Sequence, residues 1–137
     1  MHIDAHLEQL TWRIIKCAMK VHSALGPGLL ESSYLACLVA ELLEAGFECE
    51  TGVKLPLSYK GVTLEQGYVI DIVVDGLVVL ELKAVEQVLP VHEAQLVTYL
   101  KLSGKPVGLL LNFNAAHMKD GIRRKVNTKR ADRKIDK

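Results

Sequence analysis

The sequence predicts a single mixed α/β domain of 137 residues. Apolar residues recur at helical spacing near the N-terminus, apolar runs punctuated by Gly and Pro fill the middle, and another helical segment precedes the last run. Half of the residues are hydrophobic, so a chain of this length can form a core without covalent cross-links.

Two helices are predicted to open the chain. The first covers Ile3 to Leu25, where an apolar residue recurs every three or four positions, and Gly26-Pro27-Gly28 ends it. The second begins at Leu29 or Leu30 and ends at Gly46, a residue suited to a left-handed C-terminal cap.

The middle of the chain is predicted to form a sheet, and the next helix runs from Pro90 to Leu102, closed by Gly104. Apolar residues occupy both alternate positions in the two central strands, which indicates a sheet covered on both faces. The predicted strands are Phe47–Glu50, Leu55–Tyr59, Tyr68–Val74, Leu77–Lys83 and Val107–Phe113.

The composition indicates the cellular compartment in which the protein is expected. The three cysteines, Cys17, Cys37 and Cys49, form no disulfide framework and no zinc-ligand pattern, which favours a reducing compartment. The sequence shows no secretion signal and no apolar span long enough for a membrane, so we expect a cytoplasmic protein.

Positive charge is concentrated at the C-terminus. The net charge is only +1, yet more than half of all Lys and Arg lie from Lys119 onward. We expect a domain over residues 1–126 and a basic polar tail over 127–137. A solvated terminus is slightly favoured for this tail over nonspecific phosphate contact.

The candidate chemistry lies on the two central strands. Glu81 and Lys83 are two residues apart on one strand and therefore share a face, and Asp71 lies on the neighbouring strand. Two carboxylates that converge in an apolar sheet need neutralisation, and Mg²⁺ favours oxygen ligands. This arrangement is typical of phosphodiester cleavage, whereas an internal ion pair is the structural alternative.

The register of the hairpin decides whether this site can form. A two-residue turn at Asp75-Gly76 would place Asp71 and Glu81 on opposite faces of the sheet. A three-residue loop, Val74-Asp75-Gly76, would pair Val73 with Leu77 and Asp71 with Val79, placing both carboxylates on one face. We therefore predict an odd-length loop or a bulge, with both carboxylates facing the Pro90–Leu102 helix.

That helix carries polar residues at helical spacing. Gln95 and Tyr99 are four residues apart on one face, and His92 lies one turn earlier. They either assist the site or form the polar flank of an amphipathic helix, and the second interpretation is favoured for His92.

Several motifs together resemble the GxxExxY protein family of the PD-(D/E)XK nuclease superfamily. They are GLLESSY from Gly28 to Tyr34, VIDIVVDGLVVLELKAVE, PVHEAQLVTYL and GLLLNF, in that order. The resemblance implies an αβββαβ core with a central mixed sheet flanked by helices, and a magnesium-dependent nuclease site. It also implies the roles of six residues: Asp71 and Glu81 as ligands of Mg²⁺ or Mn²⁺, Lys83 as the catalytic lysine, Glu31 as a further acidic residue, and Gln95 and Tyr99 as accessory contacts.

Two residues of the first motif have other interpretations. Glu31 in the first turn of a helix interacts favourably with the helix dipole without any catalytic role. Tyr34 is expected in the core or orienting Glu31. The sequence also departs from the superfamily pattern, with Ile70 in place of Pro and Val69 where many relatives have Arg; the second change could remove a phosphate contact.

The leading functional hypothesis is a metal-dependent nuclease acting on nucleic acid, with DNA favoured over RNA. A binding module that retains the nuclease fold and holds nucleic acid or a protein is the alternative, and a purely structural ion-pair network is the third. A homodimer is compatible with the sequence. No P-loop, GxSxG or HExxH motif points to another enzyme class.

Overall fold

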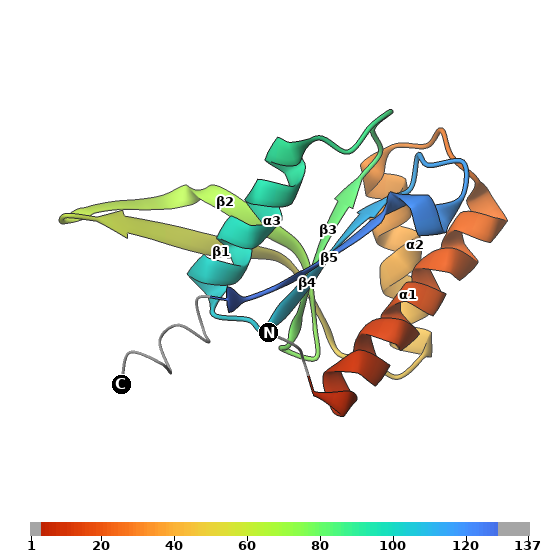
Figure 1. Cartoon of the computed structure of the whole chain (residues 1–137), viewed down its shortest axis with the longest axis horizontal. Helices are drawn as coiled ribbons and strands as arrows, with labels where there is room; N and C mark the ends of the chain where they lie inside the picture. Colours follow the sequence, from red (N-terminus) through yellow and green to blue (C-terminus); the bar gives the residue numbers. More distant parts are fainter. Residues whose placement is uncertain (1–3, 129–137) are drawn as a thin grey trace.

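The computed structural model describes residues 4–128, in which a five-stranded sheet lies between helices (Figure 1). The strands are ordered β1-β2-β3-β4-β5, and only β3 and β4 run parallel. Helices α1 and α2 cover one face and α3 covers the other (Figure 1). The elements from α2 to β4 follow the expected αβββαβ order, which confirms the predicted fold class.

The helices lie close to their predicted positions. Asp4 caps the first helix by accepting a hydrogen bond from Leu7 N, and Gly104, with φ of 72°, closes the last one. The predicted start at Ile3 lies outside the described residues. The helices are α1 (Ala5–Leu25), α2 (Glu31–Glu44) and α3 (Pro90–Ser103).

The strands differ from the prediction in three places, one of which is that β2 begins at Val62 instead of Tyr68. The first two predicted strands are one continuous strand, β1, and the last strand, β5, lies inside the basic stretch. β5 has apolar residues only at its ends, and its charged residues pair with Glu93 of α3 and Glu8 of α1. The strands are β1 (Cys49–Tyr59), β2 (Val62–Val74), β3 (Val78–Lys83), β4 (Val107–Asn112) and β5 (Ile122–Val126), with a 3-10 turn at Met118–Gly121 before β5.

Asn127, the first residue of the tail expected from the sequence, packs against the domain. Asn127 is buried, and its Nδ2 donates to the carbonyl oxygens of Leu100 and Lys105. Most of the predicted basic tail, residues 129–137, lies outside the described residues.

Both faces of the sheet are buried, as predicted. On the side of α1 and α2 the core includes Ile72, Leu80 and Leu82, and on the side of α3 it includes Val73 and Val79. Burial of both faces means that a charged side chain on β2 or β3 is removed from bulk water and needs polar partners.

Tyr34 is a core residue that holds the start of α2. Its ring stacks on Phe113 with centroids 4.7 Å apart. Its hydroxyl donates to the Gly26 carbonyl at 2.6 Å and accepts from Leu29 N at 3.1 Å. The loop that precedes Glu31 is therefore fixed by a buried side chain, as the prediction of a core role requires.

The β2–β3 hairpin has the odd-length loop that the site requires. Val74 pairs with Val78, and the loop consists of Asp75, Gly76 and Leu77. The predicted register, with Val73 opposite Leu77, is wrong, since Val73 pairs with Val79, two residues further along the chain. The turn sets this register, because Asp75 and Gly76 both adopt positive φ and Leu77 N donates to the Val74 carbonyl. This two-residue shift preserves which face each side chain occupies.

The side-chain alternation of β1 and β2 reverses at Gly52 and Asp71. Ile72 packs on the side of α1 and α2, whereas Ile70 packs on the side of α3, although two residues that are two positions apart in a regular strand share a face. Regular pairs with Thr51 and Val53 flank this point. Gly52 has φ of 60°, a conformation that is costly for residues with a Cβ atom.

We predict that Gly52→Ala destabilises the protein by about 1 kcal/mol, because Ala is strained at positive φ. Gly67→Ala is the matched control. Gly67 lies on the partner strand outside the positive-φ region, and an added Cβ meets no atom within 4 Å at either site. Urea unfolding of the two variants measures the difference, and equal stabilities would contradict a conformational requirement at Gly52.

Candidate active site

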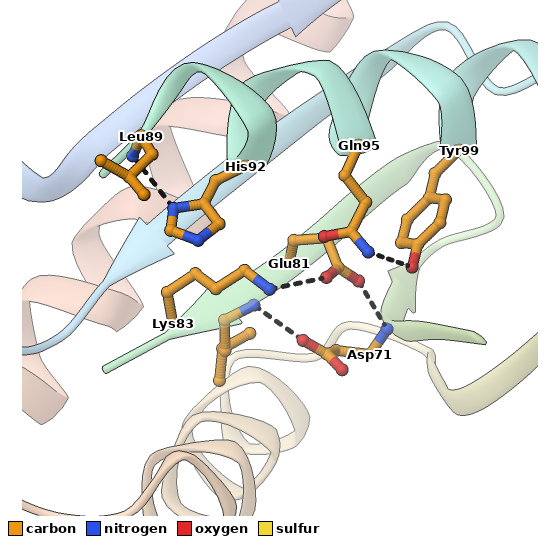
Figure 2. Close-up of polar contacts among 8 residues, drawn as sticks. Asp71, Glu81, Lys83, Leu89, His92, Gln95 and Tyr99 are labelled. Atoms are coloured by element: carbon orange, nitrogen blue, oxygen red, sulfur yellow. Dashed lines mark hydrogen bonds and ion pairs between the residues drawn. The ribbon is translucent and has the colours of Figure 1, made fainter. Parts of the chain in front are cut away.

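Asp71 and Glu81 face each other across the end of the β2–β3 pairing. The regular ladder stops at Ile72 and Leu80. Beyond it, Asp71 N donates to Glu81 Oε1 at 3.2 Å, and Leu82 N donates to Asp71 Oδ2 at 2.8 Å (Figure 2). Each strand therefore satisfies a backbone N–H with a carboxylate of the other strand, and the two acidic groups are held in fixed positions.

Lys83 shares the α3 side of the sheet with Glu81. The Lys83 ammonium lies 3.9 Å from Glu81 Oε2, and the two side chains are 18% and 6% exposed. The pair is long for an ion pair, so the ammonium remains available to a further anionic partner.

Asp71 does not face α3, contrary to the prediction for both carboxylates. It lines a pocket of about 280 Å³ toward α2, together with Glu31, Ser32, Leu35 and Leu82. The reversal at Gly52 and Asp71 explains the difference, because the alternation used for the prediction does not pass through this point.

Glu31 therefore joins the site from the opposite side of the sheet. It is the first residue of α2, and it is exposed at the rim of the pocket that Asp71 lines. Asp71 links Glu31 on the α2 side with Glu81 on the α3 side, because it forms hydrogen bonds with Glu81 and Leu82 of β3.

Helix α3 supplies polar groups above Glu81. Gln95 and Tyr99 project from α3 toward β3 (Figure 2), and Gln95 Nε2 donates to the Tyr99 hydroxyl at 3.1 Å. Tyr99 is 4% exposed and packs edge-on against Tyr68 of β2 at 6.4 Å. Five of the six predicted residues therefore lie along the junction of β2 and β3 beside α3, which we call the seam: Asp71, Glu81, Lys83, Gln95 and Tyr99. Glu31 approaches the seam through the pocket that it shares with Asp71.

A family model of the PD-(D/E)XK nuclease superfamily matches residues 8–125. The chain belongs to this superfamily. No curated protein and no solved structure matches it. Membership supports a nuclease-like function, and nucleases of this superfamily generally use divalent metal ions. No helix within residues 4–128 is long and apolar enough to cross a membrane.

The acidic groups of the candidate site are poorly compensated by neighbouring charge. Burial, followed by the charge of Asp71, raises the pKa of Glu81 to about 8. Burial also raises the pKa of Asp71, and its bond from Leu82 N and the charge of Lys83 offset this only in part. The pKa of Tyr99 is raised by burial and by the charges of Glu81 and Asp71. A neighbouring cation would relieve all three shifts.

The donor set suits a hard divalent cation. Within the described residues, no group of three or more His, Cys, Asp and Glu side chains comes together in a way that could hold a metal ion. Two carboxylates at one seam, with the remaining positions filled by water, match the way Mg²⁺ is usually bound. The two carboxylates fit an ion of this kind, which Asp71 and Glu81 would hold together with waters.

Two supporting residues were not identified from the sequence. Gly52 creates the reversal at Asp71, and an isolated Gly within a strand pattern is a signal for such an irregularity. Asn112 is 3% exposed and bonds to both the N–H and the carbonyl of Val85, while Phe113 N donates to the Lys83 carbonyl. These bonds fix the chain as it leaves Lys83, and the signal was a polar residue at the end of an apolar strand.

We predict that the metal-free protein loses stability as the pH rises from about 4.5 to about 8. The pKa of Glu81 is higher in the folded protein than its ordinary value of 4.5, so the folded state binds more protons in this interval. The slope is at most about 1.4 kcal/mol per pH unit for one group, and the raised pKa of Asp71 acts in the same direction.

Urea unfolding in EDTA at several pH values measures this slope. Glu81→Gln should remove most of it, because the amide does not titrate. Glu65→Gln, an exposed carboxylate on β2, is the control and should leave the slope unchanged. A slope that persists in Glu81→Gln would place the pH dependence elsewhere.

Proposed function

We propose that the protein is a metal-dependent nuclease of the GxxExxY family that hydrolyses phosphodiester bonds of nucleic acid, with DNA favoured. The observation that carries the proposal is the end of the β2–β3 pairing, where Asp71 N donates to Glu81, Leu82 N donates to Asp71, and the Lys83 ammonium lies beside Glu81. Two acidic groups with raised pKa values and a lysine are costly as structure alone, and their placement under polar groups of α3 suits substrate chemistry.

Mg²⁺ or Mn²⁺ held by Asp71 and Glu81 would polarise the phosphoryl oxygen and lower the pKa of a water. Lys83 lies beside Glu81 and can donate to the attacking water or to the charge that develops on the phosphate. The Asp71 and Glu81 carboxylates are already oriented by backbone N–H groups, so little reorganisation precedes binding.

Gln95 and Tyr99 would contact the substrate from the α3 side of the sheet. Their mutual hydrogen bond fixes the amide and the hydroxyl relative to each other, and both lie over the strand that carries Glu81. Glu31 would act from the α2 side, through the pocket that it shares with Asp71. We also propose a cytoplasmic location, because Cys17, Cys37 and Cys49 are all free.

A binding module without catalysis is the second candidate. The 3.9 Å separation between Lys83 and Glu81 supports it, because an ammonium that is not tightly paired can hold a phosphate without cleaving it. Cleavage and stability measurements on variants at Asp71 and Lys83 separate the two candidates.

We predict that Asp71→Asn weakens binding of Mn²⁺ by at least about 10-fold, since even loss of a supporting residue around a metal costs 10- to 100-fold. Asp75→Asn on the neighbouring turn is the control, because Asp75 bonds to Glu48 N instead of facing the seam. Isothermal titration with Mn²⁺ measures the affinity. Equal affinity in wild type and Asp71→Asn would remove Asp71 from the ligand set.

We predict that Lys83→Ala lowers the rate of DNA cleavage in Mg²⁺ by at least about 100-fold and leaves the fold stable. Lys101→Ala, an exposed lysine of α3, is the control and should cleave as wild type does. Single-turnover cleavage and urea unfolding are measured on the same samples. If Lys83 serves instead as a structural ion-pair partner, its loss costs about 3–5 kcal/mol of stability in the absence of metal.

A further inference from the structure

His92 lies on the first turn of α3 and has one engaged ring nitrogen. Its Nδ1 accepts a hydrogen bond of 3.0 Å from Leu89 N, the residue just before the helix. In the described part of the chain, Nε2 has no hydrogen-bond partner. Because a nitrogen that accepts a hydrogen bond carries no proton in the neutral ring, Nε2 carries the proton and is a donor.

The direction of His92 relates it to the candidate active site. His92, Gln95 and Tyr99 are spaced by three and four residues, and they project from one side of α3 toward the strand that carries Glu81 and Lys83 (Figure 2). The bond to Leu89 N fixes the ring, so its Nε2–H is held in position before any ligand arrives. A donor fixed in this way is suited to an anionic oxygen.

We infer that His92 is a substrate-contact residue, whose neutral Nε2–H donates to a phosphate oxygen of the nucleic-acid backbone next to the phosphate at Lys83. The inference rests on the proposed function and extends the row formed by Gln95 and Tyr99 by one helical turn. His92 would then have two roles: its Nδ1 caps the start of α3, and its Nε2–H binds the substrate.

Neutrality of the donor gives the contact a distinctive signature. A cation that contacts a phosphate releases counterions and steepens the salt dependence of binding, whereas a neutral donor adds affinity without changing that slope. Loss of His92 should therefore weaken binding by the same factor at every salt concentration.

Two substitutions separate the contact from helix capping. In His92→Asn the Oδ1 atom can replace Nδ1 as the acceptor for Leu89 N, but nothing replaces Nε2–H. His92→Ala removes both groups. His6→Asn on α1, an exposed histidine away from α3, controls for the loss of an imidazole.

The experiment measures binding of a labelled DNA with duplex and single-stranded parts, by fluorescence anisotropy at several salt concentrations. Ca²⁺ replaces Mg²⁺, a gel confirms that the DNA stays intact, and melting temperatures are recorded on the same samples. We expect about 3- to 10-fold weaker binding for both His92→Asn and His92→Ala. We also expect an unchanged salt slope and, for His92→Asn and His6→Asn, the melting temperature of the wild type.

Three results would overturn the inference. Wild-type affinity in His92→Asn, with a loss only in the less stable His92→Ala, would restrict His92 to helix capping. A slope reduced by about 1 would show a charged contact in place of a neutral donor. Wild-type protein that binds neither this DNA nor its RNA counterpart would overturn the inference together with the proposed function, whereas the first two results leave that function standing.

Discussion

The buried carboxylate of Glu81 and the half-buried carboxylate of Asp71 complete the pairing of β2 and β3, and the geometry of the site depends on the hydrogen bonds that they accept. Asp71 N donates to Glu81 and Leu82 N donates to Asp71, where a regular ladder would use carbonyl oxygens. The strands are thus held together by groups that can also bind a cation. Because the burial of Glu81 raises its pKa more than these bonds lower it, the seam remains electrostatically unsatisfied, which distinguishes it from a purely structural hydrogen-bond network.

The reversal of side-chain alternation at Gly52 makes the hydrogen bond from Leu82 N to Asp71 possible. A regular strand would keep Asp71 on the same face as Val73, packed among the apolar side chains under α3. The positive φ of Gly52 and the change of face between Ile70 and Ile72 free Asp71 to reach the Leu82 N–H and the pocket toward α2. One backbone irregularity thereby connects Glu31, on one side of the sheet, with Glu81, on the other.

Most of the fold could be predicted from local patterns, whereas the site depends on one non-local event. Helix limits follow apolar periodicity and residues such as Gly104, whose φ of 72° the sequence signals directly. The odd-length hairpin loop followed from requiring both carboxylates at one site. The direction of Asp71 did not, because it depends on Gly52, nineteen positions earlier and on another strand. β5 was missed for a similar reason, since its charged residues are compensated by Glu93 and Glu8, which lie far away in sequence.

The two sides of the seam differ in charge, and this difference favours one direction of approach for a polyanion. Toward α2 the pocket presents Glu31 and Asp71, which would repel phosphate. Toward α3 the Lys83 ammonium is accompanied by the neutral groups of Gln95 and Tyr99. Glu81 also lies on this side, but the Lys83 ammonium lies 3.9 Å from it, whereas no cation is among the residues that line the α2 pocket. The α3 side is therefore the less repulsive approach for a phosphate, and a cation between Asp71 and Glu81 would lie between the acidic pocket and the approaching anion. Lys83 is the last residue of β3 and therefore lies at the carboxyl end of the parallel pair β3 and β4, where ligands bind in many sheets of this kind.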